Sequence, residues 1–277
     1  MDLSSRRVAI LGAGNIGGAI ARGLVNAGLF TADRITLTRR TMEALGEYTR
    51  MGFAATASNA DAIRGADLVF VAVTPQQLNS LLAELKEHLD ERRHTLVSIV
   101  SGAPIAEIRA QLGSRIRIVR AMPNTAIAIR ESMTCLSVEP ADTSALQEVK
   151  TIFDALGRTL VIEEALMVPA TALCACGIAF FLRAVRAASQ GGIEIGFHAA
   201  DALLMAAQTA RGAASLLVEG GSHPENEVDK VTTPRGCTIS GLNQMEHHGF
   251  SSALIKGIVT SADKAAVLYA PKTRSDS

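Results

Sequence analysis

The sequence predicts a doubly wound α/β domain followed by an all-helical domain. Up to residue 161, short apolar runs typical of buried strands alternate with amphipathic helical patterns, which is the rhythm of a parallel sheet. From about residue 163 only long helical patterns follow, and glycines separate them. A chain of 277 residues, 48% of them apolar, can form two ordinary domains. We therefore expect a first domain at residues 1–163 and a second at residues 164–277.

Strands and helices follow one another in order through the first domain. The expected strands are residues 7–12, 34–38, 67–73, 95–100 and 116–120, with two further strands at residues 134–138 and 158–161. The expected helices are residues 17–27, 41–51, 75–89 and 104–113. Proline is tolerated in a first helical turn, and Pro75 and Pro104 stand where the last two helices begin. The two late strands should extend one edge of the sheet.

The second domain should consist of helices at residues 164–190, 198–219, 238–248 and 251–269. Residues 165–182 contain no charged residue, and such a stretch approaches the length of a membrane span. Its proline, glycine and other small residues lower its hydrophobicity, and a helix that is apolar on all sides also suits a buried core or a subunit interface. We expect an interface helix and no membrane.

Composition argues against several partners. The formal net charge is zero, which gives no electrostatic basis for binding nucleic acid or an acidic membrane surface. The four cysteines form no zinc-like or paired framework, and the one-residue spacing of Cys174 and Cys176 on a helix is poor for a metal or redox pair. We expect no metal. Because residues 1–7 are polar and the apolar strand after them is short, we expect no signal peptide and a cytoplasmic protein.

The first predicted strand leads into a glycine-rich segment at residues 12–17, Gly-Ala-Gly-Asn-Ile-Gly. In such a turn Gly12 permits the tight bend, Gly14 lets the backbone approach a pyrophosphate, and Gly17 allows the helix to pack closely on the strand. The pattern alone is weak, but βαβ units follow it here. It therefore indicates a Rossmann-type dinucleotide site, and a glycine-rich turn without a ligand is the alternative.

The second predicted strand ends in Thr38, Arg39 and Arg40 rather than in an acidic residue. An acidic side chain there would bind a ribose 2′-hydroxyl, whereas two guanidiniums suit a phosphate dianion. We therefore predict a preference for NADPH, with NADH possible but less favoured. An ordinary solvated arginine pair is the alternative interpretation.

Loops after the later strands should line the same crevice, because ligands bind at the carboxyl ends of parallel strands. Asn124, in one of these loops, could either hydrogen-bond a carboxamide or order a turn. The residues expected to bind the cofactor come from the glycine-rich turn, the end of the second strand, one further asparagine and two later loops: Gly12, Gly14, Asn15, Ile16, Gly17, Thr38, Arg39, Arg40, Asn59, Val73, Thr74, Pro75, Met122, Pro123 and Asn124.

A second anion-binding pattern lies at residues 229–242, Asp-Lys-Val-Thr-Thr-Pro-Arg-Gly-Cys-Thr-Ile-Ser-Gly-Leu. Pro234 should stop one helix, Gly236 frees the backbone, and Thr238 can cap the next helix. The backbone N–H groups that open a helix have no partner within it and lie at its positive end. This segment therefore predicts a site for a small anion.

Together these motifs resemble those of pyrroline-5-carboxylate reductases. Residues 72–76 are similar to that family's Ala-Val-Lys-Pro-Gln segment, residues 120–125 to its Arg-x-Met-Pro-Asn-Thr segment, and residues 231–242 to its C-terminal signature. Residues 12–17 look like its N-terminal fingerprint, a motif that many families share. The second and third of these segments are specific, and the match runs through nearly the whole chain.

The resemblance implies a Rossmann domain followed by a helical dimerisation domain. In the family two subunits interleave their long helices, both contribute to the active site, and assemblies of dimers also occur. The implied reaction is reduction of the cyclic imine L-1-pyrroline-5-carboxylate to L-proline by NADPH. The substrate carboxylate would lie on the backbone N–H groups of Gly236, Cys237 and Thr238, with Val231 also in contact. The Thr238 hydroxyl would be the catalytic group, hydrogen-bonded to the ring nitrogen.

Three positions depart from the family pattern. Arg235 replaces a usual glycine, and a positive φ there would strain the backbone. Residues 174–179, Cys-Ala-Cys-Gly-Ile-Ala, stand where the family usually has Ser-Gly-Ser-Gly-Pro-Ala, and Thr74 replaces a lysine. Two other functions therefore stay open. One is a related β-hydroxyacid-type dehydrogenase, for which Lys230 or Lys256 would be the acid; the other is a non-catalytic dimer that binds NADPH and a carboxylate.

Overall fold

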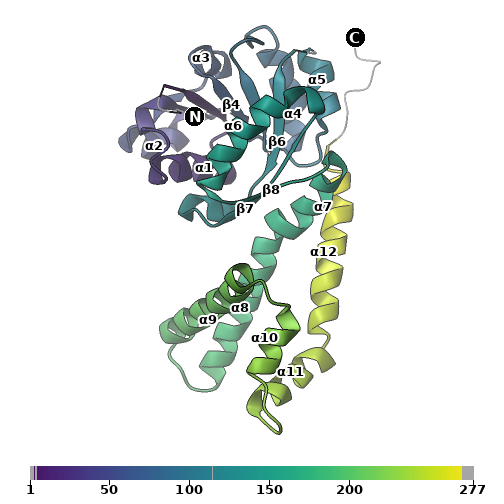
Figure 1. Ribbon diagram of the computed structural model, residues 1–277. Coiled ribbons are helices and arrows are strands. Elements are labelled where there is room, and N and C mark those ends of the chain that lie inside the picture. Colours follow the sequence, from purple (N-terminus) through teal and green to yellow (C-terminus); the bar gives the residue numbers. More distant parts are fainter. Residues whose placement is uncertain (1–2, 4, 114, 270–277) are drawn as a thin grey trace. The chain divides into compact units, whose positions relative to one another are not determined.

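The computed structural model describes residue 3 and residues 5–113 and 115–269, and its contacts divide the chain into two units (Figure 1). The first unit comprises residues 1–176 and 261–277, and the second comprises residues 177–260. The predicted domain boundary near residue 163 lies just after the last strand of the first unit, and it stays a prediction.

An eight-stranded sheet forms the first unit, in the order β3-β2-β1-β4-β5-β6-β7-β8. All neighbouring strands pair in parallel except β6 and β7, which are antiparallel. This order confirms the predicted doubly wound sheet and the two late strands at one edge. The strands are β1 (Val8–Leu11), β2 (Ile35–Thr38), β3 (Ala54–Thr56), β4 (Leu68–Val71), β5 (Thr95–Ser98), β6 (Arg117–Met122), β7 (Ser132–Val138) and β8 (Gly157–Val161).

Helices cover both faces of this sheet, and alternating strand residues form a separate core on each face (Figure 1). In β1, Ile10 belongs to one buried cluster and Leu11 to the other; in β4, Phe70 and Val71 divide in the same way. This is the period of two expected for strands buried on both faces. The helices are α1 (Asn15–Asn26), α2 (Gly46–Arg50), α3 (Asn59–Arg64), α4 (Pro75–Leu85), α5 (Ile105–Leu112) and α6 (Thr143–Asp154).

Three elements of this unit were not predicted: β3, α3 and α6. The strand β3 is short and lies at the sheet edge, so it carries little hydrophobic pattern. In α6, buried residues stand at positions 145, 148, 149, 152 and 153, which is a regular helical stripe. The helix α3 has Ser58 as its N-cap, accepting from the Asp61 N–H. Both helices therefore carried signals that sequence reasoning overlooked.

The helix expected at residues 164–190 is interrupted. It begins with the short elements η5 (Glu164–Leu166) and α7 (Met167–Ala170), continues as a π-helical turn η6 (Thr171–Cys176), and becomes α8 (Gly177–Glu194). Pro169 has no N–H for the helical ladder, which accords with the irregular start. π-Helical turns occur mostly as single turns and are frequent at functional sites.

The second unit is helical, as predicted, and it buries very little of its surface. It contains α8, α9 (Ala199–Gly220), α10 (Pro224–Lys230), α11 (Cys237–His247) and α12 (Phe250–Ala266) as far as residue 260. Within residues 177–260 only Gly177, Ser189 and Ala202 are buried. Large apolar side chains such as Phe181, Leu204 and Ile255 are more than 60% exposed. Exposed apolar surface on this scale is typical of an association surface.

Within the described part of the chain, one helical stretch, Glu164–Glu194, is long and apolar enough to cross a membrane by length and composition. Of its most apolar window, 28% is buried inside the protein. An interface between subunits would cover the same apolar side chains without lipid.

Candidate functional site

The glycine-rich turn between β1 and α1 is shaped by contacts that exclude side chains at two of its three glycines. Gly12 has a φ of +100°, and a β-carbon there would lie 2.6 Å from the Ala72 carbonyl oxygen. A β-carbon at Gly17 would lie 2.2 Å from the Gly12 carbonyl oxygen. Around Gly14, by contrast, no atom lies within 4 Å of a β-carbon position. Gly14 caps α1 without a side chain, so this helix N-terminus is open to an anion such as a pyrophosphate.

A cleft of about 500 Å³ lies beside this turn, at the carboxyl ends of β1, β2 and β4. The predicted cofactor residues that line it are Gly12 and Gly14 from the turn, Thr38, Arg39 and Arg40 after β2, Asn59 on α3, and Val73 and Thr74 after β4. The structure thus brings together residues from four separate segments of the chain. The predicted topology indicated that these segments lie close together, because the carboxyl ends of parallel strands lie on the same side of the sheet.

The arginines at this cleft are available to a ligand. Arg39 and Arg40 are both exposed, and neither forms an ion pair within the described residues. Two free guanidiniums beside a helix N-terminus suit a dinucleotide that carries an additional phosphate. This arrangement fits the NADPH preference that the sequence predicts.

The Thr38 side chain is hydrogen-bonded within the protein. Its side chain is buried, its Oγ1 accepts from the Gly12 N–H at 3.3 Å, and its hydroxyl donates to the Asn59 Oδ1 at 2.7 Å. The Asn59 Nδ2 in turn donates to the Glu84 Oε2 at 3.1 Å. The Thr38 hydroxyl therefore positions the turn and Asn59, and its contact with a cofactor stays a prediction.

Sequence reasoning missed the wall of the cleft that α4 provides. Gln77, Ser80 and Glu84 all line it. Their spacing of three and four residues places them on one face of a helix, and that helix starts in a loop predicted to line the crevice. The signal was therefore present in the sequence. Thr74 caps α4 in a capping box with Gln77, and Pro75 occupies the first turn of that helix.

Asn124 orders a turn. Its Oδ1 accepts from the Ala126 N–H at 3.0 Å, and its Nδ2 donates to the Cys174 carbonyl at 3.2 Å. It also donates its backbone N–H to the Ser132 Oγ, and it caps η3 (Thr125–Ile129). Of the two interpretations open from the sequence, these contacts favour the turn. The predicted cofactor residues that do not line the cleft are Asn15, Ile16, Gly17, Pro75, Met122, Pro123 and Asn124, and their contacts stay predictions.

In the second unit, the predicted anion-binding segment is a tight turn that leads into α11. The Gly236 N–H donates to the Thr233 carbonyl at 2.9 Å, with Pro234 and Arg235 between them. Arg235 has a φ of 60°, in the left-handed region that favours glycine. Proline second and a positive φ third is the pattern of a type II turn. From the sequence, a positive φ at Arg235 is expected to strain the backbone, and Arg235 has that positive φ.

Two details of this turn correct the sequence prediction. The N-cap of α11 is Gly236 and not Thr238, because the turn brings the chain into helical geometry already at Cys237. The Gly236 N–H is also not free for an anion, since it closes the turn. A β-carbon at Gly236 would lie 2.4 Å from the Thr233 Oγ1, so this glycine permits a close approach rather than a positive φ.

What remains at the start of α11 is a small set of polar groups. The N–H groups of Cys237 and Thr238 lie in the first turn, where a helix supplies no acceptors. The Thr238 hydroxyl makes no hydrogen bond within the described residues. Val231, which ends α10, is 63% exposed. These groups are chemically suited to a carboxylate and a neighbouring polar atom.

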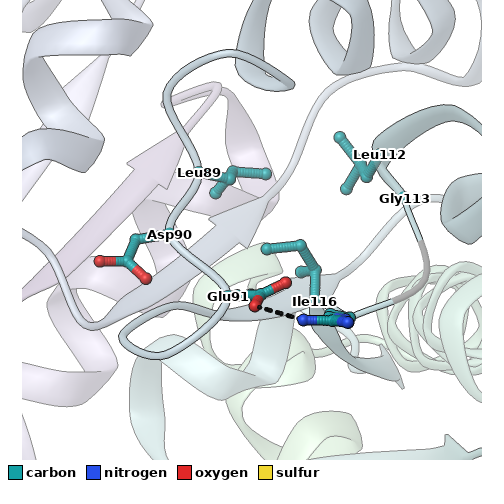
Figure 2. A pocket seen from close by; sticks show the side chains of 7 residues that line it. Leu89, Asp90, Glu91, Leu112, Gly113 and Ile116 are labelled. Carbon is teal, nitrogen blue, oxygen red and sulfur yellow. Dashed lines mark hydrogen bonds and ion pairs between the residues drawn. The ribbon is translucent and has the colours of Figure 1, made fainter.

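A second pocket, of about 610 Å³, lies before the amino ends of β5 and β6 (Figure 2). It is bounded by Leu89, Asp90 and Glu91 before β5. Before β6, its lining residues are Leu112, Gly113, Arg115 and Ile116. Arg115, one of its lining residues, forms an ion pair with Glu91 at 3.3 Å. Because it stands at the amino ends of parallel strands, without a glycine-rich turn, it has none of the features of the cleft. Among the described residues no group of three or more His, Cys, Asp or Glu could hold a metal ion.

Comparisons with known proteins match both parts of the chain. The family described as pyrroline-5-carboxylate reductase dimerisation matches residues 164–268, and that described as NADP oxidoreductase coenzyme F420-dependent matches residues 7–102. The chain is 53% identical to pyrroline-5-carboxylate reductase 1 of Dictyostelium discoideum, over 99% of this chain and 52% of that protein. The chain therefore spans about half the length of this relative.

A second relative is covered almost completely. Pyrroline-5-carboxylate reductase 2 of Dictyostelium discoideum is 46% identical, over 95% of this chain and 93% of that protein. Among solved structures, the chain is similar to a Plasmodium falciparum pyrroline carboxylate reductase with NADP bound. That match has a TM-score of 0.86 and 23% identity and covers 96% of this chain and 99% of that one, which shows a shared fold.

Proposed function

Because this chain belongs to the pyrroline-5-carboxylate reductase family, we propose that it reduces L-1-pyrroline-5-carboxylate to L-proline with NADPH, the last step of proline biosynthesis. The observation that carries the proposal is the start of α11. There two first-turn N–H groups and the uncommitted hydroxyl of Thr238 stand after a tight turn. A carboxylate next to an imine nitrogen is a ligand of matching chemistry.

The first unit would hold the cofactor. The open side of Gly14 would let the pyrophosphate approach the N-terminus of α1, where the backbone of Asn15 and Ile16 follows. Arg39 and Arg40 would hold the 2′-phosphate. Val73, Thr74 and Pro75, together with Met122 to Asn124, are proposed to complete its contacts. When bound, NADPH would supply the hydride that the imine carbon accepts.

The second unit would hold the substrate. We assign the ring carboxylate to the N–H groups of Cys237 and Thr238, with Val231 as an apolar contact. Gly236 contributes by permitting the turn rather than by donating. The Thr238 hydroxyl would hydrogen-bond the ring nitrogen and orient or relay its proton. Orientation is the main requirement, because a protonated imine is already a good hydride acceptor.

The match to the dimerisation family supports a homodimer that acts on a small molecule. The apolar side chains exposed on α8, α9 and α12 provide surface for that association. We propose that the protein is cytoplasmic, that dimers can assemble further, and that neither membrane nor nucleic acid is a partner.

The test compares substrates and one matched pair of variants. Oxidation of NADPH is followed with L-1-pyrroline-5-carboxylate and, in parallel, with the ketones that β-hydroxyacid dehydrogenases produce. We expect turnover of the imine alone, retained in Thr238→Ser and strongly reduced in Thr238→Ala. Turnover of the ketones instead would support a dehydrogenase. Tight NADPH binding with no turnover of any substrate would support a non-catalytic dimer.

A further inference from the structure

Two cysteines from distant parts of the first unit stand next to each other. Cys135 lies on β7 and Cys174 in η6, 39 residues apart in sequence, and their sulfur atoms are 4.0 Å apart. Cys135 is 3% exposed, and Cys174 is partly exposed. The sequence spacing directs attention to Cys174 and Cys176 instead. The fold pairs Cys174 with Cys135.

The surroundings of this pair are apolar. Cys135 belongs to a small buried cluster with Met122, Met167 and Ala170, and Cys174 packs against it. The contact between the two sulfur atoms therefore lies beside apolar side chains.

The two thiols differ in acidity because a hydrogen bond joins them. The hydrogen bond from Cys135 lowers the pKa of Cys174 to about 7, against the opposing effect of burial. That same hydrogen bond, followed by burial, raises the pKa of Cys135. For Cys176, burial raises the pKa. Near neutral pH the pair therefore consists of a partly ionised, partly exposed thiol and a buried thiol that donates to it, which is the arrangement of an attacking and a resolving cysteine.

The backbone holds Cys174 in this position. Its carbonyl accepts from the Asn124 Nδ2 at 3.2 Å, and the π-helical turn that contains it is tied down by a hydrogen bond from the Thr171 hydroxyl to the Met167 carbonyl. Joining the sulfur atoms requires a side-chain rotation and a small approach, because a disulfide needs sulfur atoms about 2 Å apart.

We propose that Cys135 and Cys174 form a reversible disulfide, a redox modification site that ties the π-helical turn before α8 to β7. With a hydroperoxide as oxidant, the Cys174 thiolate attacks the peroxide oxygen, the O–O bond breaks, and hydroxide or alkoxide leaves. Cys174 is then a sulfenic acid. The Cys135 sulfur attacks it, the S–O bond breaks, and water leaves with the Cys135 proton. In sum, two thiols are oxidised to one disulfide while one peroxide is reduced, and a dithiol reverses the change by exchange.

The test uses the full-length chain carrying Cys176→Ser and Cys237→Ser, which leaves only the proposed pair. After treatment with hydrogen peroxide, we expect both thiols to disappear from a titration of the denatured protein. The mass should fall by two hydrogens, and dithiothreitol should restore both thiols. The matched control carries Cys174→Ser and Cys237→Ser and keeps Cys135 with Cys176. There we expect no internal disulfide.

The wild-type protein supplies a second measurement that does not depend on the variants folding. Peptide mapping after peroxide treatment should find a cross-link between the peptides that contain Cys135 and Cys174. Two outcomes would overturn the proposal: both thiols staying titratable while the exposed Cys237 is oxidised, or a cross-link that involves Cys176 in place of Cys174. Oxidation that dithiothreitol does not reverse would equally exclude a disulfide.

Discussion

Two turns in this chain lead into helices, one at residues 12–17 in the first unit and one at residues 233–238 in the second, and they form in different ways. In the first, the residue with positive φ is Gly12, and neighbouring backbone also excludes a side chain there. In the second, the residue with positive φ is Arg235, while Gly236 has an ordinary φ of −75° and is needed for close approach to Thr233. In both turns, therefore, a glycine leaves room for neighbouring atoms that a side chain would clash with. Only in the first turn is a glycine also the residue with positive φ.

The settings of the two turns differ as well. The first stands between β1, all of whose residues are buried, and a helix packed on the sheet. The second lies in a unit where only three residues of 177–260 are buried, namely Gly177, Ser189 and Ala202. A side chain that clashes in the first turn should therefore lower stability, whereas loss of the Thr238 hydroxyl after the second turn should alter catalysis. Four predictions test this contrast, from the largest expected effect to the smallest.

Gly17→Ala should have the largest effect. Its β-carbon would lie 2.2 Å from the Gly12 carbonyl oxygen, so α1 must move away from β1. We expect a loss of about 3 kcal/mol in the free energy of unfolding, the range of severe overpacking. Urea unfolding at a fixed protein concentration measures it.

Gly14→Ala is the matched control for this loss, because nothing lies within 4 Å of its β-carbon. Its free energy of unfolding should change by no more than about 1 kcal/mol. Its affinity for NADPH should fall about tenfold or more, equivalent to about 1.4 kcal/mol, because the methyl group occupies the proposed path of the pyrophosphate. Equal unfolding losses in the two variants would contradict the steric account of the turn.

Thr238→Ala should show the opposite pattern in the second turn. We expect kcat/KM for the imine to fall roughly 100-fold, the lower end for a positioned proton-transfer group. The free energy of unfolding should change little, since Thr238 is not the cap of α11. Steady-state kinetics and urea unfolding, with Thr238→Ser as the control that keeps the hydroxyl, separate the two effects. A variant that turns over normally would remove Thr238 from the mechanism.

The Arg39→Ala, Arg40→Ala double variant tests what the cleft of the first unit selects. Losing charge-assisted hydrogen bonds of about 1.5–3 kcal/mol should lower the preference for NADPH over NADH about tenfold to a hundredfold. The ratio of kcat/KM for the two cofactors measures it. Arg64→Ala is a suitable control, because Arg64 pairs with Asp61 on the surface and does not line the cleft. An unchanged ratio in the double variant would mean that the arginines are only solvated.

The sequence predicted the sheet well because strands buried on both faces carry continuous apolar runs, as in β1 and β4. It missed β3, which is three residues long, and α6, whose stripe of buried residues includes a charged one, Glu148. Patterns of polarity do not show that Glu148 pairs with Arg6 at 3.1 Å. Such a burial depends on a partner far away in sequence.

Site residues that belong to one local sequence pattern could be predicted. Interactions between segments far apart in the sequence could not. The turn at residues 12–17 and the two arginines were found from local pattern and topology. The hydrogen bonds of the Thr38 hydroxyl with Gly12 and Asn59 were not predicted, because they join three segments of the chain. The pairing of Cys135 with Cys174 was hidden for the same reason. The loss of the Gly236 N–H to Thr233 was local, yet it depends on the conformation of Arg235 between them.

Arg235→Gly should give the smallest effect, and in the stabilising direction. A non-glycine residue in the left-handed region lowers the stability of the folded state by about 1–2 kcal/mol, and glycine would remove that strain. Part of this gain is offset because glycine also makes the unfolded chain more flexible. We expect a net gain of about 1 kcal/mol in the free energy of unfolding, measured at a fixed protomer concentration because association contributes to stability. Arg130→Gly is the matched control, since Arg130 has a φ of 63° but also donates from its Nε to the Ala155 carbonyl at 3.0 Å. Removing that hydrogen bond should cancel most of the gain at Arg130. If Arg235→Gly were instead destabilising or abolished turnover, the Arg235 guanidinium would have a function that outweighs the backbone strain. The second turn would then require a side chain at its positive-φ position, whereas the first turn excludes one at Gly12.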